Sequence, residues 1–134
     1  MRCLSSGRIL FVDFDGRNRS SDSLLELLVD SGIDVLLVRE RATLFLELLA
    51  WSPQVVVIDG DPPGIDYVAL EDSIRAVARV GVATVFMSRR PRPEGLCSWV
   101  ISKPTDPSEF LSVIRSALAS RRPSLRRPVQ STRS

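Results

Sequence analysis

Four polar residues that could carry chemistry each stand at the end of a short apolar run. They are Asp13, Asp59, Ser88 and Lys103. Lys103 is the only lysine among 18 basic residues, and its compact ammonium differs from a guanidinium in shape and hydrogen-bonding geometry. The chain has no histidine, and Cys3 and Cys97 lack metal-ligand spacing, so zinc sites, Ser-His triads and imidazole bases are excluded. Any chemistry must use carboxylates, hydroxyls, arginines or this lysine.

Three carboxylates near the ends of the runs, those of Asp13, Asp15 and Asp59, indicate a cation site. Carboxylates brought close together repel one another unless a cation neutralises them, and a site made only of oxygen ligands suits Mg²⁺. A carboxylate beside such an ion can attack a phosphoryl group, and a metal, an ammonium and a hydroxyl can stabilise the charge that develops. Lys103 and Ser88 supply the ammonium and the hydroxyl. The residues therefore predict a phosphoryl-transfer site that uses Mg²⁺.

Five apolar runs predict the strands that position these residues. The runs are Ile9–Val12, Val35–Val38, Val55–Ile58, Val82–Met87 and Trp99–Ile101. Continuous runs of β-branched residues are typical of strands that are buried on both faces of a sheet. Because open α/β sheets bind ligands at the carboxyl ends of their strands, we expect the four polar residues to meet at that edge.

Apolar residues at helical spacing predict helices between and after the runs. The four sets are Leu24, Leu25 and Leu28; Leu44, Leu48 and Trp51; Leu70, Ile74 and Val77; and Phe110, Ile114 and Leu118. Asp106 is expected to cap the last helix, with Pro107 in its first turn and Glu109 completing a capping box. In the third helix, Glu71 and Arg75 are expected to pair on the exposed side.

The alternation of strands and helices predicts an α/β fold, in which a five-stranded parallel sheet has helices on both faces and forms a three-layer sandwich. One crossover departs from this pattern. Residues 89–98 link the fourth and fifth runs and include Pro91 and Pro93. A helical crossover needs about ten to twelve residues and does not tolerate prolines in its interior. The fourth helix is therefore expected to be short or missing.

Length and charge predict one folded domain with two unlike ends. A chain of 134 residues can bury one core but hardly two. We expect residues 1–7 to be an N-terminal extension, 8–120 the domain and 121–134 a disordered tail. The tail has five arginines and no acid, whereas residues 1–120 carry 13 basic and 16 acidic residues. Without a long apolar run or a signal-like start, a cytoplasmic protein is expected.

The segment Val56–Asp66 resembles the phosphoacceptor loop of the receiver domains of bacterial two-component response regulators, with Pro63-Gly64 in the family's usual place. The resemblance extends over residues 8–119. It implies that Asp59 accepts a phosphoryl group and that the fold is flavodoxin-like, with strands in the order 2-1-3-4-5. It also implies a phosphoacceptor signalling domain, not an enzyme.

The other polar residues match the same family. Asp13 resembles a member of the acidic pair that follows the first strand, so the resemblance implies Mg²⁺ held by Asp13, Asp15, Asp59 and the backbone carbonyl of Asp61. Ser88 matches the switch serine or threonine, and Lys103-Pro104 matches the family's lysine and its proline, which is often in cis. The implied partners are a histidine kinase or phosphotransfer protein and a downstream protein target. Neither a DNA-binding domain nor a membrane is implied.

Two positions depart from the family's pattern. Phe14 stands where the second acid should ligate Mg²⁺, so Asp15 would have to replace that acid from a shifted backbone. Phe14 itself is expected to pack in the core or at the edge of the site. Val100 occupies the place of the switch aromatic, with Trp99 one position away. Metal binding and switching are therefore less clearly implied than the family itself.

Two other interpretations remain open. The segment Phe11–Gly16 resembles the nucleophile motif of haloacid-dehalogenase-type phosphatases, with Asp13 as nucleophile and Asp15 as general acid and base. That superfamily's acidic motif should follow its serine and lysine, but here the matching residues precede both. The second alternative is a pseudo-receiver that acts as an interaction module without phosphorylation, which Phe14 and the short fourth crossover favour. The retained phosphoacceptor, serine and lysine favour an active receiver.

Overall fold

The computed structural model of the protein describes residues 7–14, 19–60, 64–78 and 81–120. Within these ranges strands and helices alternate along the chain as far as β4, which β5 follows without a helix between them. The elements are β1 (Arg8–Asp13), α1 (Arg19–Asp30), β2 (Asp34–Val38), α2 (Arg41–Trp51), β3 (Val55–Asp59), α3 (Tyr67–Val77), β4 (Ala83–Ser88), β5 (Trp99–Ser102) and α4 (Pro107–Ser120). No helix in these ranges is long and apolar enough to cross a membrane.

The described strands form one parallel sheet in the order β2-β1-β3-β4-β5, as predicted. The central strand β3 is buried along its whole length, and in β1 only Arg8 is exposed. The edge strand β2 is half-buried over most of its length. The apolar runs without polar alternation therefore belong to strands that helices cover on both faces.

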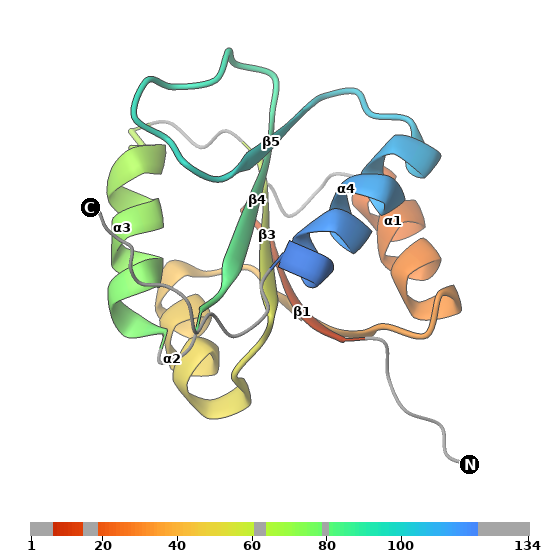
Figure 1. Ribbon diagram of the computed structural model, residues 1–134, viewed down its shortest axis with the longest axis horizontal. Coiled ribbons are helices and arrows are strands. Elements are labelled where there is room, and N and C mark those ends of the chain that lie inside the picture. The colour runs from red at the N-terminus through yellow and green to blue at the C-terminus, as the bar shows by residue number, and fades with distance from the viewer. Residues whose placement is uncertain (1–6, 15–18, 61–63, 79–80, 121–134) are drawn as a thin grey trace.

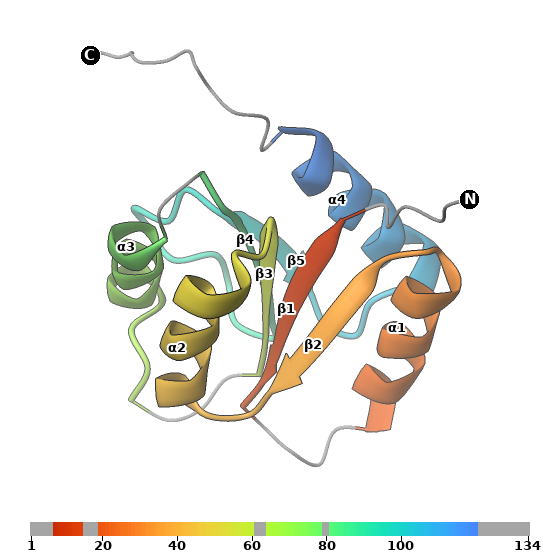
Figure 2. The ribbon, with the colours of Figure 1, turned by 90° about the horizontal axis from the view of Figure 1, so that it is seen from below.

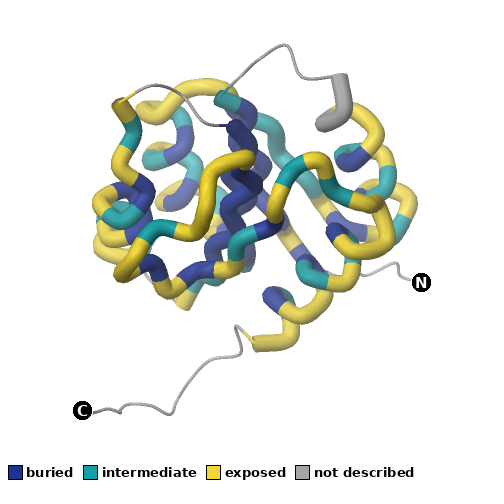
Figure 3. The backbone as a smooth tube through the Cα atoms, turned by 90° about the horizontal axis from the view of Figure 1, so that it is seen from above, coloured by how far each residue is buried: buried dark blue, intermediate teal, exposed yellow. Residues whose placement is uncertain are grey.

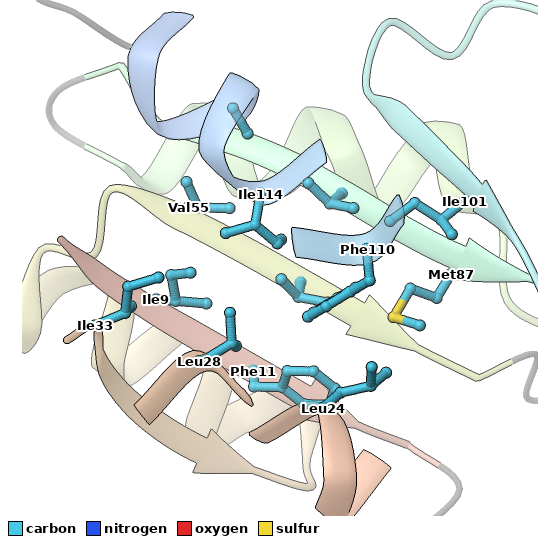
Figure 4. Packing of buried hydrophobic residues seen from close by; sticks show 13 residues of the cluster. Ile9, Phe11, Leu24, Leu28, Ile33, Val55, Met87, Ile101, Phe110 and Ile114 are labelled. Atoms are coloured by element: carbon cyan, nitrogen blue, oxygen red, sulfur yellow. The ribbon is translucent and has the colours of Figure 1, made fainter. Parts of the chain in front are cut away.

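Helices cover the two faces in pairs, with α1 and α4 on one face and α2 and α3 on the other (Figures 1 and 2). Side chains alternate between the faces of a strand. Phe11 accordingly packs with Leu28 and Phe110 under α1 and α4 (Figure 4), whereas Leu10 joins the cluster under α2 and α3. Burial is concentrated in the strands and on the inward faces of the helices (Figure 3). The predicted three-layer sandwich is confirmed.

Helix α4 begins where the sequence predicts, because Asp106 caps it. The Asp106 carboxylate accepts a hydrogen bond from the Ser108 hydroxyl and one from the Glu109 backbone nitrogen at 3.2 Å. These two hydrogen bonds, the first with the larger effect, hold the pKa of Asp106 below its ordinary value. The cap fixes the start of α4 next to the end of β5, at the sheet edge where the polar residues gather.

No helix links β4 to β5, and residues 89–98 of this connection all belong to the described part of the chain. Leu96 is 5% exposed and packs in the apolar cluster under α2 and α3. The Leu96 carbonyl accepts a hydrogen bond from Arg92 Nη2 at 2.7 Å, and its backbone nitrogen donates to the Pro93 carbonyl at 3.4 Å. The prediction of a short or missing fourth helix is confirmed, and a single leucine joins the connection to the core.

Glu71 of α3 anchors the end of this connection. Its side chain is 3% exposed and lies 3.4 Å from Arg75. Its carboxylate also accepts hydrogen bonds from the Cys97 backbone nitrogen at 3.0 Å and from the Ser98 hydroxyl. The predicted pairing of Glu71 with Arg75 is confirmed. Its predicted place on the exposed side of the helix is wrong, because the connection covers α3 there.

The environment of Glu71 makes stability depend on pH. Burial raises the pKa of Glu71, but hydrogen bonds from Ser98 and Cys97 and the charge of Arg75 together bring it below the ordinary value of 4.5. A lowered folded-state pKa stabilises the protein above pH 4.5, and this contribution is lost as the pH falls through the folded-state pKa. Below pH 4.5 we expect the free energy of unfolding to fall more steeply in the native chain than in Glu71→Gln.

Urea unfolding of both proteins, from about pH 6 down to about pH 3, measures this difference. The Glu71→Gln chain is the reference, because Asp106 and the other carboxyl groups titrate in both proteins and cancel in the comparison. Parallel curves over this range would show that the Glu71 carboxylate contributes nothing to the pH dependence.

Candidate functional site

The four polar residues meet at the carboxyl edge of the sheet. Asp13 ends β1, Asp59 ends β3, Ser88 ends β4 and Lys103 directly follows β5. These strands are neighbours in the order β1-β3-β4-β5. The register sets Asp13 beside Asp59, and Ser88 beside Ser102, the residue before Lys103. The edge therefore presents two carboxylates, a hydroxyl and an ammonium within four adjacent strands.

A buried ion pair joins Lys103 to Asp59. The Lys103 Nζ lies 2.6 Å from Asp59 Oδ1, and the two side chains are 6% and 0% exposed. The Lys103 backbone nitrogen donates to the Ser88 carbonyl at 3.0 Å, and the Lys103-Pro104 peptide bond is cis. Because a buried charge is costly without a partner, the ammonium compensates the charge of the buried Asp59 carboxylate.

Backbone hydrogen bonds hold Asp59 and the residue after it. The Asp59 carbonyl accepts from the Phe14 nitrogen at 3.1 Å, and the Gly60 nitrogen donates to the Met87 carbonyl at 3.3 Å. Gly60 has a φ of 122°, a conformation that favours glycine. Its carbonyl accepts a hydrogen bond from the Tyr67 hydroxyl at 2.7 Å. These hydrogen bonds hold the end of β3, and with it Asp59, to the neighbouring strands and to Tyr67 of α3.

Ser88 is held by a local turn. It is 3% exposed, and its Oγ accepts a hydrogen bond from the Arg90 backbone nitrogen at 2.9 Å. Such serine turns are common in loops. A serine hydroxyl carries one proton to donate besides the oxygen that accepts. Ser88 therefore brings a group of the donor type to this edge.

The described residues supply part of a magnesium site. The carboxylates of Asp13 and Asp59 are both buried and lie on adjacent strands, and Mg²⁺ is commonly held by one or two carboxylates while it keeps several waters. In residues 7–14, 19–60, 64–78 and 81–120, no group of three or more His, Cys, Asp or Glu side chains could hold a metal. The predicted ligands Asp15 and Asp61 lie outside the described residues.

Two residues that depart from the family's pattern pack against the core. Phe14 is half-buried and packs against the apolar cluster under α2 and α3, as its sequence position predicts. Val100 packs against the same cluster. Trp99 is 38% exposed, so the aromatic residue of β5 lies partly at the surface.

Sequence reasoning missed Tyr67 and Arg90. Tyr67 is the only tyrosine of the chain and the first residue of α3, directly after the capping residue Asp66. Helical side chains lean toward the amino end of their helix, so an aromatic hydroxyl at this position could have been expected to reach the end of β3. Arg90 places its guanidinium carbon 5.9 Å from the centroid of the Tyr67 ring. No comparable sequence signal marks this second contact.

No protein-family model and no curated protein matches the sequence, but the structure is similar to solved receiver domains. A CheY-like response regulator receiver domain protein from Methanospirillum hungatei superposes with a TM-score of 0.71 and 20% identity, over 86% of this chain and 95% of the other. The protein has the receiver fold. The receiver domain of the hybrid histidine kinase CckA has a TM-score of 0.66 and 23% identity, over 84% of this chain and 99% of its own. A two-component response regulator from Clostridium difficile has a TM-score of 0.71 and 16% identity, over 84% of this chain and 96% of its own.

The receiver fold confirms the predicted flavodoxin-like architecture with strands in the order 2-1-3-4-5. It does so although the connection between β4 and β5 contains no helix. In this receiver fold the only lysine of the chain lies against the aspartate that ends the central strand β3. The geometry thus brings into contact two of the residues that the sequence analysis expected to meet at the carboxyl edge.

Proposed function

We propose that this protein is the receiver domain of a response regulator. Asp59 accepts a phosphoryl group from a histidine kinase or a phosphotransfer protein, and the phosphorylated protein signals by binding a downstream protein target. The observation that supports this most directly is the buried contact of 2.6 Å between Lys103 Nζ and Asp59 Oδ1, at an edge that also presents Asp13 and Ser88. The protein acts as a phosphoacceptor and does not turn over a substrate.

The residues at this edge fit each part of the transfer. A carboxylate oxygen of Asp59 attacks phosphorus in line, the P–N bond of the donor phosphohistidine breaks, and its electron pair remains on the imidazole. The Lys103 ammonium, already beside the Asp59 carboxylate, then compensates the charge of the phosphoryl oxygens. The Ser88 hydroxyl donates a hydrogen bond to one of these oxygens.

Magnesium fits the same proposal. The carboxylates of Asp13 and Asp59 would hold the ion from adjacent strands. Asp15 and the backbone carbonyl of Asp61 are the further ligands that we propose. When bound, the ion supplies positive charge that stabilises the transferring group.

A second candidate is the pseudo-receiver that acts without phosphorylation. Phe14 stands directly after Asp13, and its hydrocarbon side chain, which packs against the core, offers no oxygen ligand. The ammonium of Lys103 also compensates the charge of the Asp59 carboxylate. In this alternative the ion pair stabilises one fixed conformation of an interaction module.

Incubation with acetyl phosphate and Mg²⁺ tests the proposal. We expect intact-protein mass spectrometry to show the addition of one phosphoryl group, and fragment spectra to place it on Asp59. Beryllofluoride with Mg²⁺ is expected to shift the backbone amide signals of Asp59 and Ser88. Asp59→Asn is expected to abolish both responses, because the attacking carboxylate is gone.

The matched control is Asp66→Asn, which changes another aspartate near the same edge. Asp66 caps α3 through the Val68 and Ala69 nitrogens at 3.0 and 3.1 Å, and asparagine is an equally good cap. Phosphorylation should persist in this variant. An unmodified native chain with unchanged spectra would support the pseudo-receiver, whereas steady turnover of a generic phosphate ester that disappears in Asp13→Asn would support a phosphatase.

A further inference from the structure

Tyr67 contacts both sides of the phosphoacceptor site. Its hydroxyl donates to the carbonyl of Gly60, the residue after Asp59, at 2.7 Å. Its ring lies 5.9 Å from the guanidinium carbon of Arg90, which is within the range of a cation–π interaction. The backbone nitrogen of Arg90 in turn donates to Ser88 Oγ at 2.9 Å. One side chain therefore connects the end of β3 with the turn that holds Ser88.

The ring of Tyr67 is the fixed member of this set. Tyr67 is 4% exposed and packs against Phe86, with ring centroids 5.0 Å apart and planes inclined at 44°. The cap at Asp66 fixes the helix start directly before it. Arg90, in contrast, is an exposed residue outside any helix or strand. Any displacement within the set is therefore expected at Arg90.

Arg90 also begins the part of the connection between β4 and β5 that lies between two anchors. The near anchor is the contact of Arg90 with the Tyr67 ring. The far anchor consists of Leu96 in the core and the hydrogen bonds of Cys97 and Ser98 to Glu71 of α3. Residues 91–95 between the anchors are exposed, apart from the half-buried Pro93. The connection runs beside α3, which carries both anchors (Figure 1). A displacement of Arg90 would therefore move residues 91–95 relative to α3.

We propose that Tyr67 is a positioning residue that couples the Asp59 site to residues 91–95 through Arg90. This coupling rests on the proposed function. When a phosphoryl oxygen on Asp59 attracts the Ser88 hydroxyl, the hydrogen bond from the Arg90 nitrogen to Ser88 Oγ lengthens and the turn opens. The Arg90 guanidinium then leaves the face of the Tyr67 ring. Residues 91–95 become the surface that differs between the free and phosphorylated states.

The single tyrosine allows a direct test, because ring-¹³C-labelled tyrosine gives the NMR signals of Tyr67 alone. Beryllofluoride with Mg²⁺ is expected to shift these ring signals and the amide signals of residues 91–95. In Arg90→Ala we expect beryllofluoride to shift the amide signals of Asp59 and Ser88 as in the native chain. The shifts of the Tyr67 ring signals and of the amide signals of residues 91–95 should be lost. Arg90→Lys should restore part of this response, since it restores a cation over the ring.

Two further variants distinguish a coupling through Arg90 from a general loosening of the connection between β4 and β5. Arg92→Ala removes the hydrogen bond to the Leu96 carbonyl within the connection but leaves the Tyr67–Arg90 contact, so the ring should respond as in the native chain. Tyr67→Phe keeps the ring but removes the hydrogen bond to the Gly60 carbonyl. It should weaken beryllofluoride binding about 2-fold to 10-fold, the effect of one hydrogen bond.

The outcomes distinguish this coupling from the function on which it rests. Shifts at Asp59 and Ser88 without any response of the Tyr67 ring and residues 91–95 would overturn the coupling and leave the phosphoacceptor role intact. The coupling would also be overturned if Arg90→Ala kept the full response of the ring. If no signal moves and acetyl phosphate leaves Asp59 unmodified, both proposals are wrong.

Discussion

Lys103→Met is expected to lower the free energy of unfolding by about 3–5 kcal/mol at neutral pH, as when one partner of a buried ion pair is removed. The Asp59 carboxylate is 0% exposed and has the Lys103 ammonium 2.6 Å away, so this substitution leaves a negative charge buried. Asp13 lies beside it in the adjacent strand and adds a second acidic group. Urea unfolding at pH 7 measures the loss.

A double variant shows whether the loss comes from the buried Asp59 charge that no longer has its ammonium partner. Lys103→Met combined with Asp59→Asn removes both charges, so we expect it to be clearly more stable than Lys103→Met alone. Arg115→Met, on the exposed face of α4, is the matched control for exchanging a cation for methionine and should change stability by no more than about 0.5 kcal/mol. Equal losses for Lys103→Met and Arg115→Met would show that the ion pair contributes nothing to stability.

The fold could be predicted because its signals are local. The runs that became β1 and β3 are continuous and apolar, which requires cover on both faces. Asp106 stands directly before the apolar stripe of α4 and caps it. The prolines and the short length of residues 89–98 together disfavour a helix there. The carboxyl edge also followed, since parallel strands end at the same side of a sheet.

The contacts within the site could be predicted only in part, because they depend on residues far apart in the chain. The sequence singled out Lys103 and Asp59, which are 44 residues apart, but their contact requires β5 to reach β3 across β4. The prediction that Glu71 lies on the exposed side of α3 was wrong for a related reason. A Glu–Arg pair four residues apart occurs on exposed helix faces, and nothing local shows that the connection after β4 folds back over this one.

The absence of a helix after β4 gives Glu71 an importance that its sequence position does not show. Glu71→Ala removes the acceptor of the Cys97 backbone nitrogen and of the Ser98 hydroxyl, and it leaves Arg75 without one of its two acidic partners. Each buried polar group without a partner costs about 1–3 kcal/mol. We expect the free energy of unfolding to fall by about 2–4 kcal/mol, and the amides of residues 96–98 to lose protection from hydrogen exchange.

Asp72→Ala is the matched control, because Asp72 pairs with the same arginine at 3.5 Å from a position that is 66% exposed. An exposed ion pair contributes little, so this variant should lose no more than about 0.5 kcal/mol and keep the protection of residues 96–98. If the two variants lost stability equally, the carboxylate of Glu71 would act only as a surface partner of Arg75. The connection would then depend on Leu96 and on the contact between Arg90 and Tyr67 for its attachment to α3, since the described hydrogen bonds between them all end at Glu71.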